Sequence, residues 1–105
     1  MTTFMVISTH SPDQCPLANS KAREAYGSDP APMMALMQRL GIRPIAGPLS
    51  SVEHKTYVIV DAPKVEAVRE FLVQSGLALW NSVEVIHVVS SEETAKEMAS
   101  VKPIY

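Results

Sequence analysis

The sequence predicts an α+β domain in which a four-stranded antiparallel sheet carries helices on one face. Three consecutive stretches support this prediction. Residues 56–60 and 83–89 are rich in β-branched side chains, which suit a pleated sheet. The segment 63–75 between them has apolar residues at helical spacing. Together they form a strand–helix–strand unit around which the rest of the chain is arranged.

The central helix of this unit has signals at both ends. Pro63 fits the first helical turn, where a missing backbone N–H removes no hydrogen bond, and Gly76 fits just beyond the last turn. Between these ends one apolar stripe faces the sheet and predicts a helix packed on one side. The stripe consists of Val65, Val68, Phe71 and Leu72.

The chain begins with a predicted strand over 3–9 that ends at His10. A polar turn follows, and Pro16 within it is well placed as the first residue of a helix that runs over about 17–26. Cys15 then becomes the expected N-cap of this helix.

Glycine and proline residues divide the middle of the chain into separate elements. Residues 27–32 contain a glycine and two prolines and interrupt the first helix. A second helical piece follows, which Gly41 ends. Residues 42–54 form a poor strand, because prolines cannot donate to a ladder, so we expect this strand at a sheet edge and a turn at 51–54 before the next strand. The second helical piece has its apolar residues at Met33, Leu36, Met37 and Leu40.

After the last strand, Ser90 and Glu93 have the spacing of a capping box and predict a short final helix to about Ser100. The resulting order is β-α-β-β-α-β plus a terminal helix, which is the ferredoxin-like arrangement. This arrangement has the strand order 4-1-3-2. It places the proline-bearing second strand at an edge, so the local and global predictions agree.

Composition excludes several classes of function. The chain has 105 residues and a net charge of -2, so we expect a single domain over 1–105 without the basic field that nucleic acid requires. The first residues include no basic segment, and their apolar run is too short for a signal peptide or a membrane span. We therefore expect a cytoplasmic protein with neither a nucleic-acid nor a membrane partner. A single cysteine excludes an intramolecular disulfide.

One face of the predicted sheet would remain uncovered. Alternation gives three of the strands apolar side chains on both faces, whereas the helices of this topology cover only one. The apolar area of such a face exceeds that of the patches that monomers usually expose. The fourth strand is also an edge with little protection against pairing with another chain. We therefore expect a homodimer that packs sheet to sheet. The alternative is that the last helix, with Met98 and Val101, folds over the open face.

Two segments carry a resemblance to a known group of proteins. The first strand ending in His10 and the strand-to-helix passage at 57–68 resemble the dimeric α/β-barrel superfamily, and most nearly its small nickel-binding family and uncharacterised relatives. The resemblance covers about half of the chain and implies a dimer with a metal site or a small-molecule pocket. The superfamily also includes muconolactone isomerases and cofactor-free monooxygenases. Because this chain has an insertion after His10 and carries Tyr57 at the start of the third strand, the identity of the metal does not carry over.

The best constellation for chemistry is His10, Cys15 and His54. In an antiparallel sheet the end of the first strand lies beside the start of the third, which brings His10 near His54. The turn at 11–15 can fold Cys15 back toward both. Two imidazoles and a thiolate suit Zn, Ni or Cu. The alternative is that both histidines are surface residues at strand ends.

Cys15 also has a second interpretation. At a helix N-terminus its thiolate would face the positive end of the helix dipole, and a nearby His10 would lower its pKa further. This predicts a nucleophilic or redox-sensing thiol, and Cys15 is thus a candidate catalytic residue. The alternative is that it packs beside Pro16 as a small apolar side chain.

An enzyme of the isomerase or monooxygenase kind is the competing hypothesis. His87 shares a strand face with valines and could act as a base in an apolar pocket, with His10 as the other candidate. Tyr26, Tyr57 and Trp80 could line a pocket for a small-molecule ligand. The alternatives are that His87 is a hydrogen-bonded core residue, that the aromatic rings fill the core, and that the protein is a structural or regulatory dimer.

Overall fold

The four strands pair in the order β2-β3-β1-β4, and each neighbouring pair is antiparallel. The computed structural model describes residues 1–27 and 29–105; Ser28, in the predicted interruption at 27–32, lies outside them. The observed order confirms the α+β class and the edge position of the proline-bearing strand. The strands are β1 (Thr2–Thr9), β2 (Arg43–Ser50), β3 (Lys55–Ala62) and β4 (Ser82–His87).

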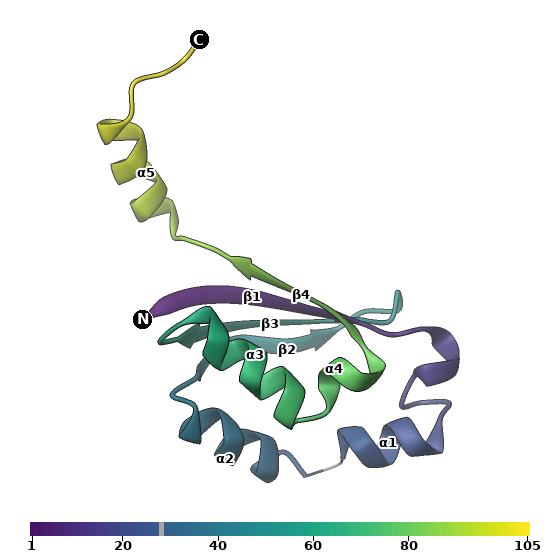
Figure 1. Cartoon of the computed structure of the whole chain (residues 1–105). Coiled ribbons are helices and arrows are strands. Elements are labelled where there is room, and N and C mark those ends of the chain that lie inside the picture. The colour runs from purple at the N-terminus through teal and green to yellow at the C-terminus, as the bar shows by residue number, and fades with distance from the viewer. Residues whose placement is uncertain (28) are drawn as a thin grey trace.

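Helices α1 to α4 lie on one face of the sheet, and α5 stands away from it (Figure 1). Because α5 projects, the radius of gyration is 16.1 Å, against about 13 Å for a compact chain of this length. Among the described residues, no helix combines the length and the apolar character needed to cross a bilayer. The helices are α1 (Ser20–Tyr26), α2 (Ala31–Arg39), α3 (Val65–Gln74), α4 (Leu77–Trp80) and α5 (Ser91–Ser100), with one 3-10 turn, η1 (Pro12–Gln14).

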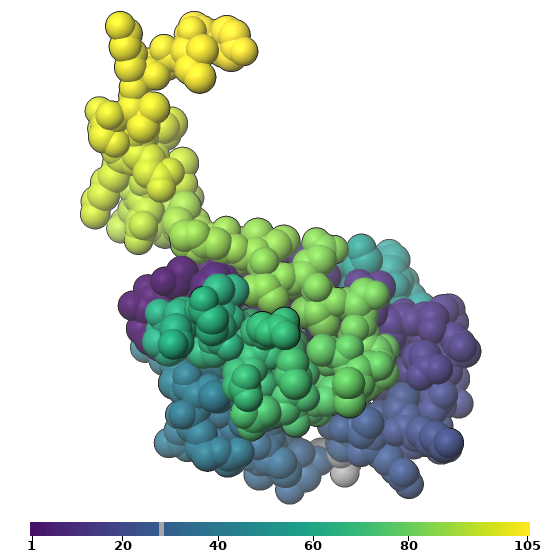
Figure 2. Space-filling view, viewed as in Figure 1, coloured from purple at the N-terminus to yellow at the C-terminus, as the bar shows by residue number. Residues whose placement is uncertain are grey.

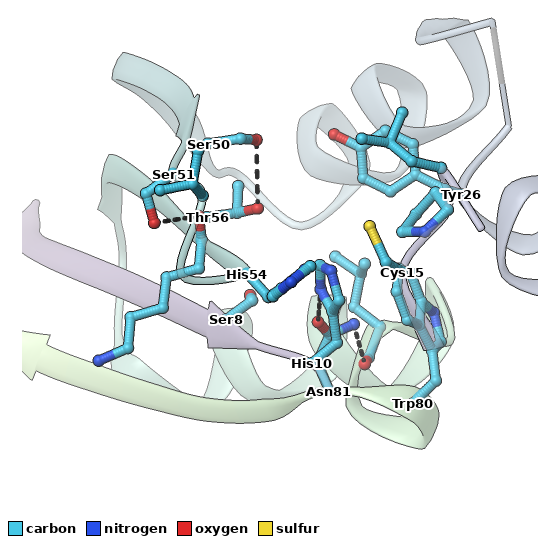
Figure 3. Close-up of a pocket in the computed structure, with 15 residues that line it drawn as sticks. Ser8, His10, Cys15, Tyr26, Ser50, Ser51, His54, Thr56, Trp80 and Asn81 are labelled. Atoms are coloured by element: carbon cyan, nitrogen blue, oxygen red, sulfur yellow. Dashed lines mark hydrogen bonds between the residues drawn. The ribbon is translucent and has the colours of Figure 1, made fainter. Parts of the chain in front are cut away.

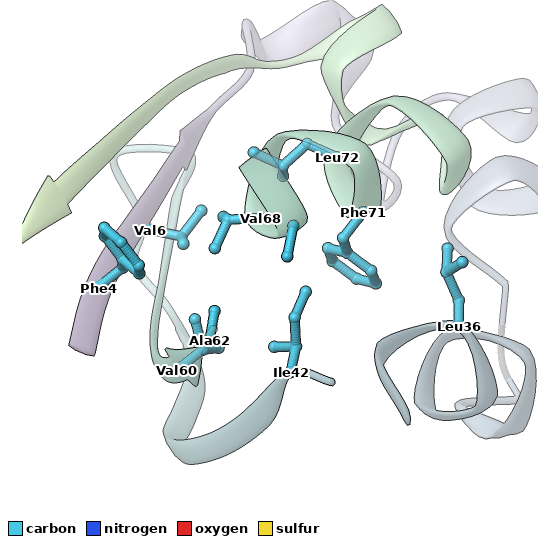
Figure 4. Close-up of a cluster of buried hydrophobic side chains, with 10 residues drawn as sticks. Phe4, Val6, Leu36, Ile42, Val60, Ala62, Val68, Phe71 and Leu72 are labelled. Carbon is cyan, nitrogen blue, oxygen red and sulfur yellow. The ribbon is translucent and has the colours of Figure 1, made fainter. Parts of the chain in front are cut away.

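The hydrophobic core lies between the sheet and helices α2 and α3 (Figure 4). β1 and β3 direct alternate side chains toward α3, as the strand period of two requires, and α3 contributes three residues of its predicted stripe. Val65, the fourth residue of that stripe, is 46% exposed instead, because it is the first residue of the helix. The buried cluster comprises Phe4, Val6, Leu36, Ile42, Val60, Ala62, Ala67, Val68, Phe71 and Leu72.

The start of α1 differs from the sequence prediction. The helix begins at Ser20, and its N-cap is Asn19, whose side-chain oxygen accepts a hydrogen bond from the Ala22 N–H at 3.0 Å. Asparagine is among the strongest N-cap residues, because its short side chain reaches the free N–H groups of the first turn. The prediction that Cys15 caps this helix is therefore wrong. Cys15 instead follows the 3-10 turn η1.

The ends of α3 differ from the prediction on one side only. Lys64 is the N-cap of α3, so Pro63 precedes the helix instead of lying in its first turn. At the other end Gly76 has a φ of 81°, the left-handed conformation that commonly ends a helix, as predicted. Gly76 also precedes α4, a helix of 4 residues, which is too short to show a periodic apolar pattern in the sequence.

The remaining predicted elements are confirmed. α2 ends just before Gly41, which has a φ of 74°. A turn over residues 51–54 joins β2 to β3. At the start of α5 the Ser90 side chain accepts a hydrogen bond from the Glu93 N–H at 3.2 Å, which is half of the predicted capping box.

The face of the sheet opposite the helices is uncovered, and it has apolar side chains at its centre with the charged residues Glu84 and Asp61 around them. β1 and β3 place Met5, Ile7, Tyr57 and Ile59 on it. The edge strand β4 adds Ile86, which is 40% exposed. α5 does not cover this face, since none of its residues is buried and it extends away from the rest of the molecule (Figure 2). The alternative in which the last helix folds over the open face is therefore wrong.

Asp61 joins three strands on the open face. The Thr3 hydroxyl donates to one carboxylate oxygen at 2.6 Å, and the Arg43 guanidinium donates to the other at 2.9 Å. The Thr3 hydrogen bond first, and then the Arg43 contact, hold the pKa of Asp61 below its ordinary value. One carboxylate thus links β1, β2 and β3.

Replacing Asp61 with Asn should change how folding responds to acid. A carboxylate whose folded pKa lies below its unfolded value stabilises the fold above about pH 4, and this contribution is lost as the pH falls through the folded pKa. We expect the wild-type chain to have the higher urea midpoint near neutral pH and the two midpoints to converge on acidification. A difference that stays constant into strong acid would contradict this role of Asp61.

Candidate metal centre

The end of β1 and the turn before β3 bring two histidines together. The register pairs Thr9 with Lys55, and the next step along the ladder pairs His10 with His54. The His10 N–H donates to the His54 carbonyl at 3.1 Å, and the two ring centroids lie 5.3 Å apart. The predicted meeting of the two histidines at this end of the sheet is therefore confirmed.

His54 has an uncommon backbone conformation. Its φ is 62°, in the left-handed region that residues other than glycine seldom adopt, at a cost on the order of 1 kcal/mol. The His54 N–H donates to the Ser51 carbonyl at 3.2 Å and closes the turn. The same turn therefore fixes both the strain at His54 and its position opposite His10. Strained residues of this kind cluster at functional sites.

Cys15 approaches the two histidines from the segment that follows β1. The turn η1 reverses the chain there, and the Cys15 N–H donates to the Pro12 carbonyl at 3.3 Å. Cys15 is buried, and its sulfur and one nitrogen of each imidazole lie within 4.8 Å of one another. Figure 3 shows the three side chains side by side in a pocket. Two imidazoles and one thiol at this spacing could hold a metal ion.

Asn81 determines which nitrogen of His10 is available to a ligand. The Asn81 side-chain amide donates to the Leu77 carbonyl at 3.1 Å, so its oxygen is the atom that faces His10. His10 Nδ1–H donates to this oxygen at 3.4 Å, and a neutral imidazole has only one such proton. His10 Nε2 therefore keeps its lone pair. This nitrogen is buried and has no hydrogen-bond partner among the described residues.

Asn81 is the functional residue that the sequence analysis missed. It caps the C-terminus of α4, where its backbone N–H also donates to the Leu77 carbonyl at 3.0 Å. It lies far from His10 in the chain, and no motif connects the two residues. Only the position of α4 beside the end of β1 reveals the contact. An asparagine in a loop before a strand is, from sequence, an ordinary turn residue.

The three side chains line a pocket of about 560 Å³, a size typical of small-molecule sites. Tyr26 and Trp80 line it as well, in a T-shaped pair with centroids 6.4 Å apart. The indole of Trp80 also lies 5.6 Å from the His10 ring. Two of the three aromatic residues expected in the pocket are thus present. The pocket and the candidate metal ligands form one continuous site.

Tyr57 and His87 lie elsewhere. Tyr57 is on the open face of the sheet, because strand alternation turns its neighbour Thr56 toward the pocket. The prediction that Tyr57 lines the pocket is therefore wrong. His87 is exposed and lies against Phe4, with ring centroids 5.9 Å apart. Phe4 is six residues from His10 along β1, or roughly 20 Å. The structure therefore does not bring His87 together with the other candidates.

The position of Cys15 removes one argument for a reactive thiol. The predicted activation depended on the positive end of a helix dipole, but α1 begins at Ser20 with Asn19 as its cap. The dipole effect falls off within the first turn. The thiol does lie beside two imidazoles, a setting found around metal-binding cysteines and around reactive ones alike.

No protein-family model matches this chain, and no curated protein matches it. The resemblance to the dimeric α/β-barrel superfamily therefore stays a prediction.

The hydrogen bond to Asn81 predicts an unusual state of His10. In long-range proton–nitrogen NMR spectra of the metal-free protein with neutral histidines, we expect His10 as the Nδ1–H tautomer. A neutral histidine side chain in water prefers the Nε2–H form, and His87 serves as the internal reference. Asn81→Ala should return His10 to the common form, because the acceptor is removed, whereas Asn81→Asp keeps an acceptor and should preserve the Nδ1–H form. An Nε2–H tautomer at His10 in the wild-type protein would contradict the orientation described above.

Proposed function

We propose that this protein binds one transition-metal ion through His10 Nε2, the Cys15 thiolate and an imidazole nitrogen of His54. One observation carries the proposal: a buried imidazole nitrogen without a hydrogen-bond partner belongs to a group whose ligand atoms lie within 4.8 Å of one another. An unsatisfied buried polar atom costs about 1–3 kcal/mol. A metal ion would supply the partner that the fold does not.

The spacing is compatible with coordination after a small adjustment. Zinc bonds of about 2.0 Å to nitrogen and about 2.3 Å to sulfur place tetrahedral ligand atoms roughly 3.3–3.6 Å apart. The three ligand atoms already lie within 4.8 Å of one another. The distances between them must therefore shorten by about 1 Å for coordination, and rotation of the side chains can provide this change. The His10 ring is already oriented, because Asn81 accepts its Nδ1–H. Such outer hydrogen bonds orient metal-binding histidines in known sites.

The donor set indicates the kind of ion. Two neutral imidazoles and one thiolate carry a single negative charge, so a divalent ion would keep a net positive charge at the site. Imidazole and thiolate suit zinc, nickel or copper, whereas magnesium and calcium prefer oxygen ligands. Three protein ligands also leave one tetrahedral position open, as in catalytic rather than structural zinc sites. Since all three ligands line the pocket, a molecule in the pocket can reach that position.

We also propose that the domain is ferredoxin-like and pairs sheet to sheet with a second copy, as in the dimeric α/β barrels that the sequence resembles. The strand order and the single layer of helices support the first statement. The second is supported by the apolar side chains on the open face, where a monomer would leave Met5, Ile7 and Ile59 without cover.

Cobalt binding tests the metal site directly. Protein purified without an affinity tag should bind one Co²⁺ per chain and show an intense near-ultraviolet thiolate charge-transfer band. His10→Ala, Cys15→Ser and His54→Ala should each weaken binding at least about tenfold, because each removes a ligand. Cys15→Ser should also abolish the band.

His87→Ala is the matched control for this titration. His87 is a histidine of the same sheet outside the proposed set, so its variant should bind Co²⁺ as the wild type does. Uptake that is absent, or that falls equally in the His87 and His10 variants, would exclude the proposed site.

Light scattering coupled to size exclusion tests the pairing. The wild-type chain should elute with twice the mass of one chain at micromolar concentration. Ile7→Glu, which places a charge on the open face, should yield a monomer, because a buried unpaired charge is strongly unfavourable. Leu79→Glu is the control, since Leu79 is 84% exposed on α4. A monomeric wild-type protein would contradict the sheet-to-sheet dimer.

A further inference from the structure

We propose that the pocket binds a small organic carboxylate with an apolar, preferably aromatic, body, and that the carboxylate occupies the open position of the metal. This inference rests on the proposed metal site and adds the class of its ligand. Three properties of the pocket lining support it: its charge, the location of its hydroxyl groups, and its aromatic and aliphatic wall.

The charge of the lining favours an anion. Among the described residues that line the pocket, no carboxylate is present. A divalent ion held by two imidazoles and one thiolate would give the site a net positive charge. A cavity lined by one sign of charge attracts ligands of the opposite sign and disfavours cations.

Hydroxyl groups lie on the side of the pocket formed by β2 and β3. The Ser50 and Thr56 hydroxyls are 3.4 Å apart, and the Ser51 hydroxyl donates to the Lys55 carbonyl at 3.4 Å. Figure 3 shows Ser50 and Thr56 across the pocket from Tyr26, with His54 between the two sides. A carboxylate with one oxygen on the metal can direct its other oxygen toward this side, where hydroxyl donors are present.

The opposite side of the pocket suits an apolar body. Tyr26 and Trp80 present aromatic surfaces there, and aromatic rings pair well in T-shaped or offset geometry. Leu17 and Val52 also line the pocket, yet they are 85% and 92% exposed. A ligand with an apolar body would cover side chains that are otherwise in water. An inorganic anion would leave this surface exposed.

The test uses Co²⁺-loaded protein and phenylacetate as the probe. Phenylacetate should shift the visible cobalt bands, because a carboxylate oxygen enters the coordination shell. It should also change the fluorescence of Trp80, the single tryptophan of the chain. Acetate should shift the bands with an affinity about ten- to a hundredfold lower, because it lacks the ring. Benzyl alcohol, which lacks the carboxylate, should leave the cobalt bands unchanged.

Two variants assign the contacts. Thr56→Val, which removes a hydroxyl from the pocket, should weaken phenylacetate binding about three- to tenfold while Co²⁺ binds as before, and Thr94→Val, on α5, is the matched control. Trp80→Leu should reduce the advantage of phenylacetate over acetate. If Co²⁺ does not bind, the proposed metal site fails. If Co²⁺ binds but phenylacetate leaves its bands unchanged, or if inorganic phosphate binds as tightly as phenylacetate, the metal site stands and the carboxylate proposal is overturned.

Discussion

The antiparallel register of β1 and β3 is the constraint on which the site depends. It is fixed along the whole pair from Thr2 with Ala62 to Thr9 with Lys55, and the buried side chains of Phe4, Val6 and Val60 hold it in place. A slip by one residue would turn every side chain to the other face. The packing of the core therefore also determines that His10 and His54 meet, although neither residue belongs to the core.

The pocket is built where regular structure ends. β1 stops at Thr9, η1 returns the chain, and α4 closes the gap before β4. Each of these short segments supplies one part of the site: Cys15 follows η1, and Trp80 and Asn81 come from the end of α4. Functional groups are commonly found on connections that a rigid scaffold positions. In this protein the scaffold is the sheet with α3, and the connections supply much of the lining of the pocket.

Much of this arrangement could be predicted from sequence, because it depends on periodicity and turn chemistry. The alternation in β1 and β3, the apolar stripe of α3 and the prolines of β2 are local patterns, and they lead to the correct strand order. The meeting of His10 and His54 follows from the antiparallel pairing of β1 with β3 and from the short turn before β3. The features that could not be predicted depend on single contacts or on very short segments. Asn19 caps α1 in place of Cys15, and α4 is too short to show a periodic apolar pattern. The contact of Asn81 with His10 joins residues that no sequence motif connects. Tyr57 was misplaced by one position along its strand, since Thr56 is the residue that faces the pocket.

The Cys15–His10–His54 group also joins parts of the chain that are distant in sequence, and this couples occupancy to folding. A metal bound there would tie the segment after β1 to the turn before β3 and would close a loop of more than forty residues, roughly two-fifths of the chain. A ligand that binds only the folded form shifts the folding equilibrium toward it by mass action. The amount of folded protein in a cell would then follow the supply of free metal. A shortage of the ion would first lower the amount of folded chain.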